Sequence, residues 1–151
     1  MLSDWWLPFF EWCGKTWLGQ TVQNTVWTFP VIETFHLLAL AILLGSVLIV
    51  NLRVFGLGTN RASHTDMAAQ FEPWIRISIV VLILSGIPMA MSEPMKCFES
   101  WSFPIKMILL VIAIAWHFTA QRRWNGSRIA AGLSILLWLS IGIAGKGIPY
   151  V

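Results

Sequence analysis

Four apolar stretches divide the chain, and the first of them is the longest. From Val31 to Phe55 the sequence reads VIETFHLLALAILLGSVLIVNLRVF, in which apolar or small residues fill the interval from Glu33 to Arg53 with one histidine among them. At about 1.5 Å per residue, a helix of about 20 such residues crosses a hydrocarbon layer of about 30 Å. The pattern predicts four membrane-spanning helices, over residues 31–55, 74–91, 103–120 and 129–148.

Polar connections separate the predicted spans. In the first connection, Ser63 or Thr65 is placed to cap a short helix, and Pro73 is placed to open the second span. Pro88, near the end of that span, predicts a bend one turn earlier, because a proline removes the hydrogen bond to the carbonyl four residues before it.

Residues 1–29 are rich in tryptophan, and charges divide them into pieces too short to span a membrane. Aromatic residues and a cysteine recur there at helical spacing: Trp5, Trp6, Phe9, Phe10, Cys13 and Trp17. Such a segment either lies along the membrane surface or packs against the rim of the helices. We expect an all-α protein, an integral membrane four-helix bundle over 30–151, with an N-terminal interfacial amphipathic helix within 1–29.

Composition and charge support this class and suggest an orientation. With 57% hydrophobic and 11% charged residues and a mean hydropathy of +0.72, the chain lies outside the range of soluble globular proteins. If four helices alternate in direction, every arginine falls on one side and every lysine on the other. The positive-inside rule then predicts a multi-pass protein of a bacterial inner membrane with both termini periplasmic. The basic residues form no stripe with interleaved aromatics, so we expect no nucleic-acid partner.

Two histidines, His36 and His117, lie within predicted spans, where ionisable residues are candidates for function. Two imidazoles suggest a b-type haem, but helix geometry puts these two about 18 Å apart in depth, so one iron cannot bind both. Each would need its own partner. His117 has His64 on its side of the membrane, and His36 has three methionines: Met89, Met91 and Met95. Alternatively, His36 is hydrogen-bonded within the bundle and His117 lies in the interfacial layer beside the arginines.

Glu33 and His36 are three residues apart, which puts them on one face of the first helix. A carboxylate beside an imidazole favours the charged histidine and suggests a proton or quinol site. Equally, an acidic residue in the first turn of a helix is favoured by the helix dipole alone.

A cluster of soft donors follows the second span: Met89, Met91, Met95 and Cys97. Thioethers and thiolates suit Cu(I), and His36 and Cys13 are expected on the same side of the membrane. In the alternative, which we favour, the methionines fill apolar gaps, and Cys13 and Cys97 form a disulfide in an oxidising periplasm. The sequence has no phosphate-binding loop, nucleophile elbow, paired CxxC or HExxH, so we do not expect an enzyme acting on its own.

The run WTFPVIETFHLLALAILLGSVLIVNLRVFGL, with AWHF in the third span and SILLWLSIGIAGKGI in the fourth, resembles an uncharacterised family of bacterial four-helix membrane proteins. The resemblance covers most of the chain from Gln20 onward and implies a fold but no activity. In the last span Lys146 stands where that family leads us to expect arginine. By looser analogy, the chain is similar to membrane b-type cytochromes and copper-resistance membrane proteins.

Three functions follow as expectations. The first is a small redox or electron-transfer module, linked to haem b or to a quinone. The second is a non-catalytic accessory or anchor subunit, with other membrane subunits or further copies of itself as partners besides membrane lipid. The third is the handling of copper on the periplasmic side.

Overall fold

The computed structural model of the protein describes residues 4–57, 63–119, 123–124 and 126–147. Within these residues every regular element is a helix, which confirms the predicted all-α class. The helices are η1 (Asp4–Trp6), α1 (Leu7–Lys15), α2 (Trp17–Asn24), α3 (Thr28–Val54), α4 (His64–Ser92), α5 (Pro94–Glu99), α6 (Ser102–Phe118) and α8 (Arg128–Gly147).

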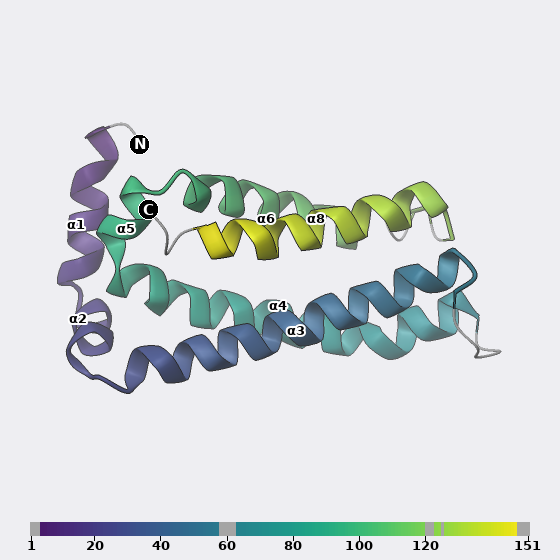
Figure 1. Ribbon diagram of the computed structural model, residues 1–151, viewed down its shortest axis with the longest axis horizontal. Helices are drawn as coiled ribbons and strands as arrows, with labels where there is room; N and C mark the ends of the chain where they lie inside the picture. Colours follow the sequence, from purple (N-terminus) through teal and green to yellow (C-terminus); the bar gives the residue numbers. More distant parts are fainter. Residues whose placement is uncertain (1–3, 58–62, 120–122, 125, 148–151) are drawn as a thin grey trace.

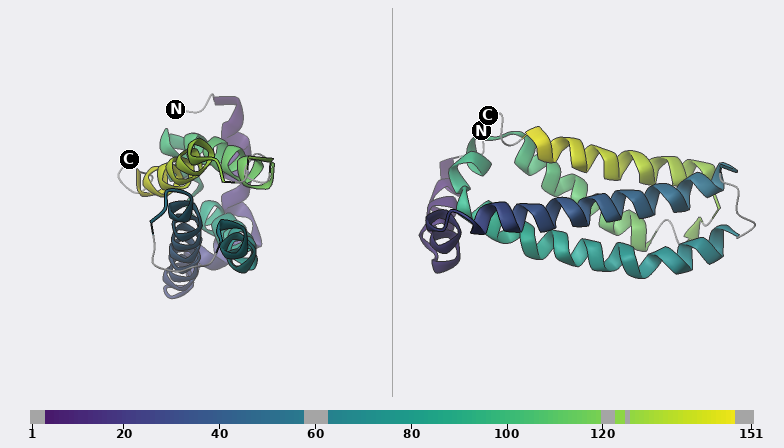
Figure 2. Two further views of the ribbon diagram at one scale, coloured as in Figure 1. Left: turned by 90° about the vertical axis from the view of Figure 1, so that its right-hand side faces the viewer. Right: turned by 60° about the horizontal axis from the view of Figure 1, so that its bottom comes forward.

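Four of these helices, α3, α4, α6 and α8, run lengthwise beside one another (Figures 1 and 2). The chief packing partners are α3 with α4, α6 with α8, and α3 with α8. The short helices α1, α2 and α5 gather at one end of the long ones, and we call these three the platform (Figure 1). The last turn of α8 also lies at this platform end (Figure 1).

Three of the described helices are long and apolar enough to cross a membrane: Thr28–Val54, His64–Ser92 and the stretch Arg128–Lys146. The fourth long helix, α6, is apolar but shorter, with 17 residues. Large apolar side chains are exposed on the outward faces of all four helices, among them Leu37, Leu84, Val111 and Leu136. A helix that is apolar on every side suits a protein interior or a membrane rather than water.

The second predicted span differs from the structure in where its helix begins. Ser63 caps α4, with its Oγ accepting a hydrogen bond of 3.2 Å from the Asp66 amide, and the helix then continues to Ser92 through Pro73 and Pro88. The prediction that Pro73 opens a separate helix is therefore wrong. The helix begins at His64, directly after the Ser63 cap and nine residues before Pro73 (73 − 64). A proline removes only one backbone hydrogen bond, and α4 continues through it.

Helix α1 has one buried and one exposed face. Its buried face carries Phe10, which packs edge to face on Phe98 of α5 with ring centroids 5.7 Å apart. Its opposite face exposes Phe9 and Trp12, and Trp5 of the preceding η1 is exposed as well. The helix is thus held against the rest of the protein and still presents an aromatic surface.

Helix α2 is fixed to the end of α4. Gly19 approaches so closely that a Cβ there would lie 2.7 Å from the carbonyl oxygen of Met91. Beside it, the Gln23 Nε2 donates a hydrogen bond of 2.5 Å to the carbonyl oxygen of Ser92. The platform and the end of α4 therefore form one packed unit.

Candidate functional site

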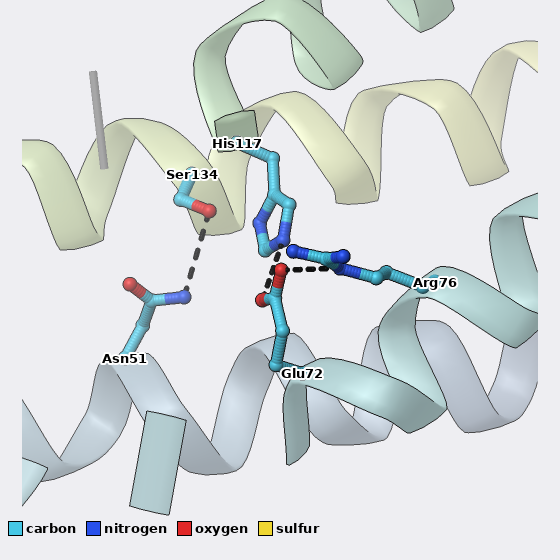
Figure 3. Close-up of polar contacts among 5 residues, drawn as sticks. All are labelled: Asn51, Glu72, Arg76, His117 and Ser134. Carbon is cyan, nitrogen blue, oxygen red and sulfur yellow. Dashed lines mark hydrogen bonds and ion pairs between the residues drawn. The ribbon is translucent and has the colours of Figure 1, made fainter. Parts of the chain in front are cut away.

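All four long helices contribute polar side chains to one level of the structure (Figure 3). This level lies near the helix ends opposite the platform. We call these five residues the polar layer: Asn51 from α3, Glu72 and Arg76 from α4, His117 from α6, and Ser134 from α8. Asn51, His117 and Ser134 are buried, so the layer lies largely inside the protein.

Glu72 is the centre of the polar layer. One carboxylate oxygen, Oε2, lies 3.1 Å from His117 Nε2, and the other, Oε1, accepts a hydrogen bond of 2.8 Å from Arg76 Nε. Glu72 and Arg76 are four residues apart on α4, which places both on one face. Because a carboxylate can only accept, we assign the proton of this contact to His117 Nε2. That nitrogen is therefore engaged by Glu72 and does not bind a metal.

The other half of the polar layer joins α3 to α8. The Asn51 amide donates to the Val47 carbonyl at 2.7 Å and, more weakly, to Ser134 Oγ at 3.5 Å. Asn51 is 1% exposed and Ser134 is fully buried, so the apolar helix interface contains a fixed polar contact. Buried polar groups of this kind are normally paired because an unpaired one is costly.

His36 occupies a second polar centre, towards the platform end. Its Nδ1 lies 2.8 Å from Ser85 Oγ, and that hydroxyl donates its own proton to the Val81 carbonyl at 2.6 Å. Since a serine hydroxyl has one proton, its oxygen must accept from His36, which assigns the Nδ1–H tautomer. The neutral ring then keeps a lone pair on Nε2, and that atom makes no hydrogen bond to any residue that the structure describes.

The two histidines lie far apart. Their partners Ser85 and Glu72 are on the same helix, α4, and are 13 residues apart (85 − 72). At about 1.5 Å per residue this separates the two centres by about 20 Å along the helix. A single haem iron cannot bind both His36 and His117.

The partners suggested for these histidines lie elsewhere. His64 opens α4 eight residues before Glu72, about 12 Å along the helix from the carboxylate that His117 contacts. Glu33 is exposed on α3, whereas His36 is turned towards Ser85. The structure therefore couples each histidine to a side chain of α4.

The soft donors do not meet on one face. Met89 and Met91 are two residues apart on α4 and so point in different directions, while on α5 Met95 is exposed and Cys97 is buried. Cys13 and Cys97 are both buried and both free thiols. Among the residues that the structure describes, no three His, Cys, Asp or Glu side chains are grouped so that they could hold a metal ion.

Cys97 is expected to react slowly with alkylating reagents. Burial, followed by the neighbouring Glu93 carboxylate, raises the pKa of the Cys97 thiol to about 11. At pH 8 the thiolate fraction is then about 0.1%, roughly two hundredfold below that of an ordinary cysteine. In a Cys13→Ser variant, the iodoacetamide reaction rate, followed by mass spectrometry, should rise about tenfold per pH unit until pH 11. A plateau by pH 9 would contradict this.

Sequence reasoning identified only His117 and missed the other four members of the polar layer as site residues: Asn51, Glu72, Arg76 and Ser134. An asparagine within the apolar run of the first span was the available signal for this layer. The i, i+4 spacing of Glu72 and Arg76 was a second signal, since an acidic and a basic residue at this spacing share one face of a helix.

A comparison with known protein families matches residues 9–151 to DUF6644, a family of unknown function. No curated protein and no solved structure matches the chain.

Proposed function

Because that match covers most of its length, the chain belongs to DUF6644, a family of unknown function, and we propose that it is a membrane-embedded redox module in which His36 contacts the cofactor, a b-type haem or a quinone. The observation that carries the proposal is the hydrogen-bonded state of His36. Its Nδ1–H is held by Ser85, and its Nε2 lone pair accepts no hydrogen bond from any of the residues that the structure describes.

This state suits both cofactors. A histidine that binds a metal generally donates its other ring N–H to a protein acceptor, as His36 does to Ser85. The same lone pair can instead accept a hydrogen bond from the hydroxyl of a quinol. Either cofactor would supply electron transfer, which no side chain of the site provides by itself. His117 pairs with Glu72 about 20 Å along α4 from the His36 centre, so in this proposal it belongs to the polar layer and not to the cofactor site.

The proposal includes a location. The four long helices would cross a bacterial inner membrane as a bundle, and their exposed apolar faces would meet lipid. The platform would lie at the periplasmic surface, where Trp5 and Trp12 suit the headgroup layer. Charge supports this orientation, because Arg53 and Arg128 lie at the end opposite the platform, whereas Lys15 and Lys96 lie in it.

The test is chemical analysis of protein purified in mild detergent from its own membranes. We expect either a reduced haem α-band with a pyridine haemochrome signal or a quinone in the organic extract, near one per chain. His36→Ala should lose most of either signal, because it removes the atom that contacts the cofactor. His64→Ala and His117→Ala serve as controls and should retain it. Fully folded protein that contains neither haem nor quinone would overturn the proposal and leave an accessory-subunit role.

A further inference from the structure

Arg76 of the polar layer carries a guanidinium that is held in place and still exposed (Figure 3). Its Nε donates a hydrogen bond of 2.8 Å to Glu72 Oε1, and its Cζ lies 5.6 Å from the centre of the Phe118 ring of α6. These two contacts orient the group, although the side chain is 50% exposed. Its two terminal Nη groups donate to no residue that the structure describes.

The exposed part of this guanidinium suits an anion. Arginine has five N–H donors in one plane, and the fork that they form matches two oxygens of a phosphate. The carboxylate beside it, Glu72, already accepts from Arg76 Nε and contacts His117 Nε2. Positive charge prevails among the described residues at this end of the long helices, where the arginines outnumber the carboxylates: Arg53, Arg76, Arg123 and Arg128 against Asp66 and Glu72.

An apolar stripe begins one turn after Arg76 on the same side of α4. Positions four, seven, eight and eleven residues further along a helix share the face of the first residue. Here these positions hold exposed apolar side chains, which we call the α4 stripe: Val80, Ile83, Leu84 and Ile87. From Arg76 to Ile87 the helix rises about 16 Å, which is close to half of a hydrocarbon layer of about 30 Å. The stripe therefore has the length of one leaflet.

Trp74 marks the depth of Arg76 in that leaflet. It lies two residues before Arg76 and is 55% exposed. An exposed tryptophan at the end of an apolar helix stretch suits the headgroup layer of a membrane, because its ring is apolar and its N–H is polar. The guanidinium therefore lies where lipid phosphates lie, and the α4 stripe extends from it towards the middle of the membrane.

We propose that Arg76 binds the phosphate of an anionic phospholipid whose acyl chain lies along the α4 stripe, in the leaflet opposite the platform. The inference uses the proposed membrane location but neither haem nor quinone, so a protein without a cofactor would leave it standing. The lipid meets both parts of the site at once. A free phosphate would meet only the guanidinium, and an uncharged lipid would meet only the stripe.

The test is native mass spectrometry of the full chain in mild detergent, titrated with phosphatidylglycerol. We expect one lipid to bind more tightly than all others. Arg76→Gln should weaken this binding about 10- to 100-fold, the range for losing a hydrogen bond to a charged group. Phe118→Leu keeps the guanidinium but removes the ring that orients it, and it should weaken binding about 2- to 5-fold, as for an exposed cation–π contact.

Arg128→Gln is the matched control, because Arg128 is an exposed arginine in the first turn of α8 at the same end, and this variant should bind as the parent does. Equal losses in Arg128→Gln and Arg76→Gln would overturn the proposal, since binding would then follow overall charge. Parent-like binding by Arg76→Gln would overturn it as well. Melting temperatures verify that each variant is folded, and if Arg76→Gln is not, parent-like binding by Phe118→Leu overturns the proposal.

Two further ligands identify what the site recognises. Diacylglycerol, which has the acyl chains without the phosphate, should not bind tightly. Inorganic phosphate at millimolar concentration should not displace the bound phosphatidylglycerol, because it cannot use the α4 stripe. Tight binding of diacylglycerol would show that Arg76 is not part of the site, and displacement by inorganic phosphate would show that the site recognises a free anion. Either result would overturn the assignment to a phospholipid.

Discussion

Replacement of Trp138 by alanine is expected to lower the free energy of unfolding by about 3–5 kcal/mol, the range for removing a buried aromatic side chain. Trp138 is 1% exposed and lies in the core with Leu43 of α3 and Ala113 of α6. It also borders a small apolar pocket of about 110 Å³ between α3 and α8, so truncation would enlarge an existing space. Three long helices would lose a shared contact.

The measurement is the midpoint of thermal or denaturant unfolding in detergent, compared with that of Trp27→Ala. Trp27 is 76% exposed, so its truncation removes little buried area and should change the midpoint only slightly. If the two variants unfold at the same midpoint, Trp138 does not hold the long helices together as this structure implies.

Replacement of Glu72 by leucine is expected to destabilise the protein by about 2 kcal/mol, as for loss of a hydrogen bond to a charged group. Most of this loss of stability comes from His117, whose Nε2 lies 3.1 Å from Glu72 Oε2. His117 is buried, so its imidazole cannot turn to solvent when the carboxylate is removed. The share from Arg76 is small, since that side chain is 50% exposed and solvent screens it. The same unfolding measurement checks this value.

The matched control is Glu93→Leu, which breaks an ion pair of 2.6 Å with Lys96 on the surface of the platform. Exposed pairs of this kind contribute about 0–1 kcal/mol, so this variant should unfold almost as the parent does. Equal effects of Glu72→Leu and Glu93→Leu would show that the polar layer adds no more stability than a surface pair.

The long helices were predictable because an apolar run long enough to cross a membrane is typical of a transmembrane helix and of few other structures. The structure places α3, α6 and α8 close to the predicted 31–55, 103–120 and 129–148. The start of α4 was not predictable in the same way, because the turns between His64 and Pro73 are polar and their helicity comes from the Ser63 cap. Hydrophobicity finds the apolar part of a helix and misses its polar extension.

The two histidines of the candidate sites were predictable from the sequence, but their side-chain partners were not, because the choice of partner depends on how the helices pack. Both histidines stood out as ionisable residues within apolar runs, and the separation derived from the sequence is close to that along α4. The hydrogen-bond partners of the histidines did not stand out. Ser85 is one of many small residues in the predicted spans, and Glu72 lies just before the predicted span 74–91. Helix rotation decides which side chains face each other, and a single sequence does not specify it.

The attachment of α2 to the end of α4 also sets an order of assembly during synthesis. Gln23 and Ser92, which share a hydrogen bond, are 69 residues apart in the chain. At a synthesis rate of about 5–20 residues per second, α2 must wait some seconds after it is made before its binding surface exists. The N-terminal aromatic helices are therefore made before the surface that holds them, and in that interval they need a temporary apolar surface.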